Sequence, residues 1–168
     1  MSGRQVGSEQ QHDYTARIQW TGNTGKGTSS YRAYQRSWDV TTPGKPIVHC
    51  SNDPLLGGDP TLHNPEDLLL ASVSSCHMLW YLHLASSQGV VIQSYVDNPI
   101  GTGEISPNGA GRFLSVTLHP TIGLAADTDT NKADAIHGLI HQYCFIARSL
   151  NFPVDIAARY ETSAQSDV

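Results

Sequence analysis

The sequence predicts an α+β domain in which two long central helices pack on mostly antiparallel sheets. Short runs that alternate apolar and polar residues indicate strands, and two long stretches of helical periodicity indicate helices. Gly-, Pro- and Asn-rich segments separate these runs and favour turns. The predicted order is three strands, a helix, two strands, a second helix and a last strand, which is typical of an α+β domain.

The first three strands are predicted at residues 14–20, 31–40 and 47–49. In the first, Tyr14, Ala16, Ile18 and Trp20 share one face. A Gly-, Pro- and Asp-rich loop covers residues 51–63, and a Gly/Asn/Pro linker separates later strands at 90–96 and 112–121; the last strand is predicted at 154–162. We predict one domain, residues 13–162, between polar, non-periodic tails at 1–12 and 163–168.

Both predicted helices have recognisable ends. In the first, Asn64 can cap, Pro65 suits the first helical position, and two acidic residues follow. This helix is expected to run to about Gln88, where Gly89 ends it. The second is expected from Asp129 or Thr130 to about Leu150, before Asn151 and Pro153.

The first helix is apolar on nearly every face, whereas an amphipathic surface helix has only an apolar stripe. One sheet covers one face, so the remaining apolar surface predicts a second subunit. His77, His83 and several small polar residues interrupt the segment 68–84, which favours a buried helix of a soluble protein over a membrane span. The apolar residues are Leu68, Leu69, Leu70, Val73, Met78, Leu79, Trp80, Leu82 and Leu84.

Composition and charge exclude several classes of function. The chain has 168 residues, with 15 acidic against 10 basic side chains and a formal charge of −5. Without a basic cluster, nucleic-acid or anionic-membrane binding is not expected as the main task. The N-terminal residues lack the apolar stretch of a signal peptide, and the three cysteines exclude a complete disulfide framework. We therefore expect a reducing, cytoplasmic setting.

Cys76 and Cys144 both fall inside helical patterns, and in such a setting a cysteine pair favours chemistry over a structural bridge. Four residues, His137, His141, Cys144 and Arg148, fall on one helical stripe, and a cation beside a thiol favours the nucleophilic thiolate. Other interpretations stay open: a cysteine can be a small buried apolar residue, Arg148 can serve a helix terminus, and the histidines can be solvated or core residues. A Cys/His metal site is a further alternative, but no Cys-x-x-Cys or His-Glu-x-x-His motif supports it.

Two segments around these cysteines resemble a known family. Asn-Pro-Glu-Asp-Leu-Leu-Leu-Ala at 64–71, continuing through Ser-Cys-His-Met-Leu-Trp-Tyr-Leu-His at 75–83, resembles the first helix of the osmotically inducible protein C / organic hydroperoxide resistance (OsmC/Ohr) family. The second match is His-Gln-Tyr-Cys-Phe-Ile-Ala-Arg-Ser at 141–149, followed by Asn-Phe-Pro-Val at 151–154. With smaller matches at 20–22 and 111–113, the resemblance spans roughly residues 14–160.

The resemblance implies an OsmC-like fold in an intertwined homodimer with active sites at the subunit interface. It implies a thiol peroxidase that reduces organic hydroperoxides without cofactor or metal. By position, Cys76 matches the cysteine that attacks the peroxide and Cys144 the resolving cysteine, so a disulfide between them is expected. Glu66 matches the glutamate that orients an arginine against the thiolate. A dithiol reductant, of lipoyl type in the family, would regenerate the enzyme.

The arginine is where the chain departs from the family pattern. Relatives with a similar loop carry it immediately before Gly-Asp, and here Gly57 occupies that slot. Other members place it earlier, so Arg36 is the first candidate and Arg32 the second, with exposed strand arginines as the competing interpretation. An apolar substrate pocket is expected from Trp38, Leu79, Trp80 and Phe145.

Helix geometry separates Glu66 from Cys76. Ten residues of straight helix span about 15 Å, so the two cannot meet within one unbroken helix. Either the helix bends, or the partner subunit's Glu66 meets Cys76.

Two other functions remain as alternatives to the peroxidase. The chain can be a non-catalytic OsmC-like stress or small-ligand-binding protein, which Gly57 makes plausible, or less readily a Cys/His metal-binding protein. Cys50 lies outside both motifs and is interpreted as structural.

Overall fold

The computed structural model describes residues 11–162. The chain divides into two compact units, residues 1–65 and 66–168. The tails predicted at 1–12 and 163–168 fall almost entirely outside the described residues. The prediction of one domain at 13–162 stays a prediction.

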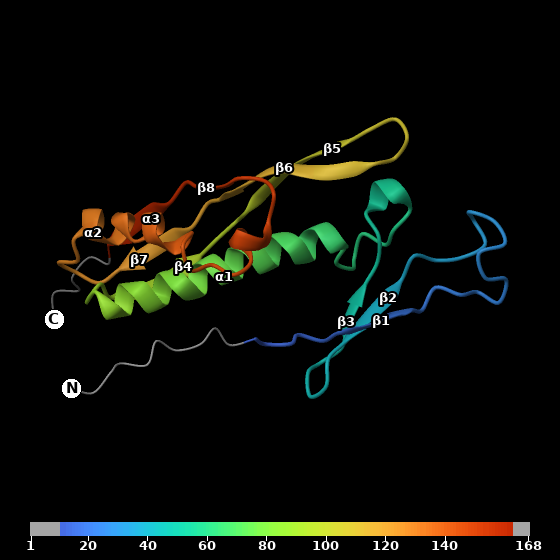
Figure 1. The fold of residues 1–168 in the computed structure, drawn as a ribbon, viewed down its shortest axis with the longest axis horizontal. Helices are drawn as coiled ribbons and strands as arrows, with labels where there is room; N and C mark the ends of the chain where they lie inside the picture. Colours follow the sequence, from blue (N-terminus) through green and yellow to red (C-terminus); the bar gives the residue numbers. More distant parts are fainter. Residues whose placement is uncertain (1–10, 163–168) are drawn as a thin grey trace, which may run out of the picture. The chain divides into compact units, whose positions relative to one another are not determined.

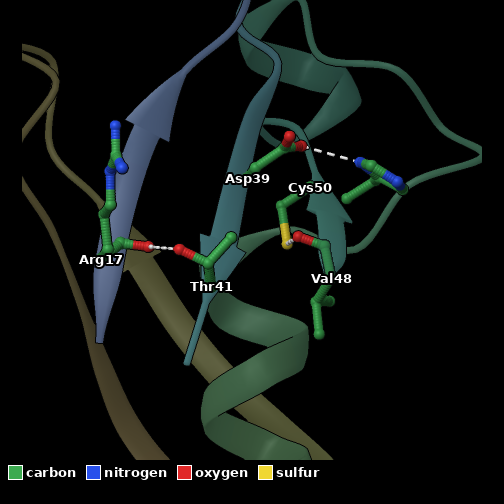
Figure 2. A network of polar contacts seen from close by, with 6 residues as sticks. Arg17, Asp39, Thr41, Val48 and Cys50 are labelled. Atoms are coloured by element: carbon green, nitrogen blue, oxygen red, sulfur yellow. Dashed lines mark hydrogen bonds and ion pairs between the residues drawn. The ribbon is translucent and has the colours of Figure 1, made fainter. Parts of the chain in front are cut away.

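The first unit is built on a small antiparallel sheet in the order β1-β2-β3. Its strands are β1 (Arg17–Trp20), β2 (Trp38–Thr41) and β3 (Val48–Cys50), followed by the 3₁₀ helix η1 (Pro54–Leu56). All three predicted strands are therefore present, although the first two are shorter than predicted. Figure 2 shows contacts between neighbouring strands: the Thr41 hydroxyl donates to the Arg17 carbonyl (3.5 Å), and Asp39 pairs with His49 (2.7 Å).

All but the first residue of helix α1 (Pro65–Ser87) belongs to the second unit, and the predicted bounds of this helix are confirmed to within a residue. Pro65 is its first residue, and Glu66 and Asp67 lie in its first turn, where the helix dipole favours negative charge. At the other end Gly89 takes a left-handed φ of 71°, which glycine adopts without strain.

The chain itself buries only one stripe of α1. The buried residues recur every fourth position, namely Val73, His77, Tyr81 and Ala85. Other apolar side chains stay exposed; Leu79, for example, is 61% exposed. By length and composition α1 could cross a membrane, and 22% of its most apolar window is buried within the chain. Within one copy of the chain, α1 therefore keeps apolar surface that no other part of the chain buries.

Two three-stranded sheets accompany α1 (Figure 1). One has the order β4-β7-β9, from β4 (Ile92–Val96), β7 (Thr121–Leu124) and β9 (Arg159–Thr162). The other has the order β5-β6-β8, from β5 (Ile100–Ile105), β6 (Gly111–Leu118) and β8 (Val154–Ile156). The predicted strands 112–121 and 154–162 are thus each split between the two sheets.

The pairing corrects part of the predicted topology. β4–β7 and β5–β6 are antiparallel, but β6–β8 and β7–β9 are parallel. Strand β5 was predicted as linker because it contains Gly101 and Gly103. A side chain at Gly101 would place its first carbon 2.5 Å from the Phe113 ring, so the glycine allows close packing inside a strand.

The buried stripe of α1 joins two clusters of the hydrophobic core. Tyr81 and Ala85 pack with β7 and the segment after it, while Val73 packs with Val116 and Leu118 of β6. His77 lies on the same stripe, between these two groups, and is 6% exposed. The core therefore places a polar side chain at the middle of its longest helix.

The second predicted helix, 129 or 130 to 150, is wrong as a continuous element. The chain instead forms α2 (Thr130–Ala135), α3 (His137–Ile140) and, after a turn, the 3₁₀ helix η2 (Ala147–Ser149). Asp129 caps α2 as predicted, accepting from the Asn131 and Lys132 N–H groups. The sequence from Gly138 to Ile146 mixes good helix formers such as Leu139 and Gln142 with glycine, aromatic and β-branched residues of lower helix propensity, so packing decides the path of the backbone.

Candidate functional site

Cys144 lies in the turn between α3 and η2. Its backbone N–H donates to the Ile140 carbonyl (2.9 Å), and its carbonyl accepts from the Arg148 N–H (3.0 Å), so the turn is closed on both sides. The side chain is 1% exposed. The turn, rather than the predicted helix, directs this thiol toward α1.

The structure brings the two predicted cysteines into contact. The Cys144 thiol donates to the Cys76 sulfur, with the two Sγ atoms 2.8 Å apart. Cys76 sits at the middle of α1 and is only partly buried. The less buried sulfur of the pair is therefore also the hydrogen-bond acceptor.

The environment of Cys144 keeps it protonated at neutral pH. Burial and then the hydrogen bond to Cys76 raise the pKa of Cys144 to about 11, and the Ala147 N–H acts weakly in the opposite direction. A protonated thiol is a poor nucleophile. The two cysteines thus differ: Cys144 is the hydrogen-bond donor of the pair and is buried, and Cys76 is the acceptor and is only partly buried.

A histidine pair that the sequence did not predict lies beside this contact. His77 Nε2 and His137 Nδ1 are 2.8 Å apart, with ring planes inclined by 11°. The Tyr81 ring stacks on His137 with 4.5 Å between centroids. Burial lowers the pKa of each histidine to about 4, aided for His77 by the other ring. Both imidazoles are therefore neutral at pH 7, and neither supplies a cation to the thiols.

A cavity of about 320 Å³ borders Cys144 but not Cys76. The four residues that were predicted to share one helical stripe all line this cavity, although they do not belong to a single helix. Apolar side chains of β8 and of the residues just before it form the opposite wall. The lining residues are His77, His137, Ile140, His141, Cys144, Ala147, Arg148, Phe152, Val154 and Ile156.

The remaining site residues of the second unit differ in exposure, and of these Trp80 packs against the same core cluster as Cys76 and Cys144. Glu66 is exposed in the first turn of α1, which runs without interruption to Ser87. Among the predicted pocket residues, Leu79 and Phe145 are 61% and 62% exposed. Trp80 stacks on Tyr143 with 5.0 Å between ring centroids.

Arg36, Arg32 and Trp38 belong to the first unit. Arg32 is exposed, whereas Arg36 is partly buried and its guanidinium lies over the Tyr31 ring. A side-chain carbon at Gly57 would lie 3.4 Å from Arg36 Nη1, so the Arg36 head group lies beside the slot in which the sequence lacks an arginine. Trp38 donates through Nε1 to the Ser51 carbonyl (3.3 Å).

Cys50 has the character of a structural residue. It is fully buried, and its thiol donates to the Val48 carbonyl (3.7 Å, Figure 2). Burial and the nearby Asp39 carboxylate raise its pKa. Across residues 11–162, no group of three or more His, Cys, Asp or Glu side chains is arranged to hold a metal ion.

Comparison with solved structures gives the same fold. An OsmC-like protein of unknown function from Vibrio cholerae is 24% identical and superposes with a TM-score of 0.79, covering 88% of this chain and 99% of the other. An organic hydroperoxide resistance protein OsmC from Legionella pneumophila is 21% identical, with a TM-score of 0.63 over 90% of this chain and 99% of the other. An organic hydroperoxide resistance protein from Elizabethkingia anophelis is 18% identical, with a TM-score of 0.64 over 91% of this chain and 99% of the other.

Comparison of sequences identifies the family. No curated protein matches the chain. The family model for OsmC-like proteins matches residues 58–159, which is more than half of the chain and includes Glu66, Cys76 and Cys144. The α+β fold, with its long cysteine-bearing helix, agrees with this match, and the protein belongs to the OsmC-like family.

Proposed function

We propose that this protein is a thiol-dependent peroxidase that reduces organic hydroperoxides, with Cys76 as the attacking and Cys144 as the resolving cysteine. The observation that carries the proposal is the 2.8 Å contact between the two sulfurs. The substrate class rests on the resemblance and on the relatives from Legionella and Elizabethkingia, which are called organic hydroperoxide resistance proteins.

The reaction that we propose uses the contact between the two sulfurs. The Cys76 thiolate attacks the terminal peroxide oxygen, the O–O bond breaks, and the departing alkoxide takes a proton to become the alcohol. Cys76 is thereby oxidised to a sulfenic acid. The Cys144 sulfur then attacks Cys76, its thiol proton joins the departing hydroxide, and water leaves as the disulfide forms. An external dithiol reduces this disulfide by exchange, and a lipoyl-type dithiol in a reducing cytoplasm fits the resemblance.

Arg36 is the arginine that we assign to activation of Cys76. Its guanidinium lies beside Gly57, where relatives with a similar loop carry the arginine, whereas Arg32 is exposed. A guanidinium favours the thiolate and stabilises charge that develops on the leaving oxygen. Glu66 would orient Arg36, and Trp38, Leu79, Trp80 and Phe145 would bind the apolar part of the peroxide.

The peroxidase proposal is tested by peroxide consumption in stopped flow. Wild type is expected to consume cumene hydroperoxide rapidly, and Cys76→Ser at no more than the rate of buffer, because serine is not ionised at neutral pH. Cys50→Ala, which removes a buried thiol of the first unit, is the matched control and is expected to react like wild type. Equal consumption by wild type and Cys76→Ser, or none by either, would favour the non-catalytic ligand-binding alternative.

We also propose that the active form is a homodimer. Several large apolar side chains on or after α1 are exposed, which is unusual for a soluble monomer and typical of a subunit interface. Glu66 cannot reach a cysteine ten residues further along the same uninterrupted helix, so the partner subunit's Glu66 would complete the site. The exposed residues are Leu79, Leu82, Leu139, Tyr143 and Phe145.

Sedimentation measurements test the dimer. The wild type is expected to sediment as a dimer at micromolar concentration, and Leu79→Arg as a monomer, because a buried, unpaired guanidinium opposes association. Ile105→Arg places the same charge at the exposed end of β5 and should leave the dimer intact. A monomeric wild type, or wild type that floats with added lipid vesicles, would contradict the proposal.

A further inference from the structure

The Arg36 guanidinium is held in place without being neutralised. Its Nη2 donates to the Tyr31 carbonyl (3.2 Å), and no carboxylate pairs with it among residues 11–162. A guanidinium carries five N–H groups, so this hydrogen bond leaves others available. Arg36 is therefore an oriented cation whose charge is still free to act on another group.

Two aromatic rings add to this restraint. The Arg36 Cζ lies 4.1 Å from the centroid of the Tyr31 ring and 5.0 Å from that of Tyr34. Both distances are within the range of cation–π attraction, which orients a guanidinium through ring faces and leaves its charge intact.

Each ring is itself anchored to a different segment. The Tyr31 hydroxyl donates to the Leu56 carbonyl (3.4 Å), next to Gly57. Tyr34 meets Trp20 edge to face with 5.8 Å between centroids, and its backbone forms a bridge with Asn23. The two rings are thus fixed by the turn at 54–57 and by the end of β1.

Gly57 completes the arrangement by having no side chain. Its φ of 80° is left-handed, and its N–H donates to the Pro54 carbonyl (3.0 Å). A first side-chain carbon there would already touch the Arg36 guanidinium, at 3.4 Å from Nη1, and a longer side chain would meet it. The glycine therefore provides both the turn and the room that the guanidinium occupies.

We propose that Tyr31 and Tyr34 are positioning residues that hold the guanidinium of Arg36 in the orientation from which it activates Cys76. This inference rests on the proposed function, in which Arg36 is the activating arginine. Ring faces orient the cation and leave its charge available to a thiolate, so Tyr31 and Tyr34 would act together with Glu66, which would complete the orientation of Arg36.

The test compares leucine with phenylalanine at both tyrosines in a Cys144→Ser background. The measurements are the rate of Cys76 alkylation by iodoacetamide at neutral pH and the rate of the single-turnover reaction with cumene hydroperoxide. Tyr31→Leu/Tyr34→Leu is expected to slow both rates about ten-fold, and Tyr31→Phe/Tyr34→Phe by less than about two-fold, because phenylalanine keeps the ring face. Equal rates in the leucine and phenylalanine variants, or a faster leucine variant, would overturn the proposal.

Arg36→Met separates this proposal from the proposed function. If the tyrosines act through Arg36, adding the leucine pair to Arg36→Met slows the reaction no further, so the effects are not additive. A full additional loss would mean that the tyrosines serve the fold only. The single variant Tyr34→Leu gives the same comparison if the leucine pair fails to fold. Normal rates in Arg36→Met would instead show that Arg36 is not the activating arginine, with Arg17→Met as the control for loss of an exposed arginine in the same unit.

Discussion

Replacing Cys144 with serine is expected to stop sustained peroxide reduction after the first few turnovers. In the wild type the Cys144 sulfur, in contact with Cys76, converts each sulfenic acid into a disulfide. Without it, the Cys76 sulfenic acid persists and meets a second peroxide, which oxidises it to the sulfinic acid. Since the sulfinic acid is not reduced by thiols, the variant is expected to lose nearly all multiple-turnover activity in excess peroxide while it keeps the first, fast reaction.

Mass spectrometry of the intact protein measures this difference directly. After one equivalent of organic peroxide, wild type should lose two hydrogens, whereas Cys144→Ser should gain one oxygen and, in excess peroxide, two. Cys50→Ala is again the matched control and should form the disulfide like wild type. Sustained turnover by Cys144→Ser with no oxygen added to Cys76 would contradict the role of Cys144 as resolving cysteine.

The first long helix could be predicted closely because its signals are local. Pro65, two acidic residues and Gly89 mark its ends, and each acts within one turn of helix. The second helix could not be predicted, because the break before Cys144 depends on packing rather than on a strong local signal. Strand β5 was missed for a related reason: Gly101 is typical of a linker in sequence, and only the Phe113 ring opposite explains why a strand needs it.

In the candidate site, too, residues within a sequence motif could be predicted, whereas contacts between distant residues could not. Motif spacing was enough to single out Cys76 and Cys144, which the structure brings into contact. Nothing in the sequence indicates that His77 pairs with His137, since sixty residues separate them and they fall in different predicted helices. The Tyr31 contact to Arg36 likewise depends on a turn whose geometry has no periodic signature.

The histidine pair is expected to make the fold strongly sensitive to acid. Both rings have an ordinary pKa of 6.5 in the unfolded chain and a pKa lowered to about 4 in the folded protein, mainly by burial. Between these values the unfolded chain binds more protons than the folded protein. The free energy of unfolding therefore falls as the pH falls from 6.5 toward 4, and the contribution of the neutral histidines to it is complete above 6.5. Each ring contributes up to about 3 kcal/mol, which is large against a total of about 5–15 kcal/mol.

Urea unfolding at a series of pH values tests this sensitivity. The charged groups that act on the pair are the Asp134 and Asp97 carboxylates near His137, which oppose the lowering of its pKa without overcoming burial. Wild type should lose several kcal/mol between the two pKa values, whereas His77→Gln/His137→Gln should lose much less, because glutamine does not titrate. His83→Gln, on the exposed side of α1, is the matched control and should keep the wild-type slope. A slope that survives in the double variant would mean that other groups, and not this buried pair, bind the protons on unfolding.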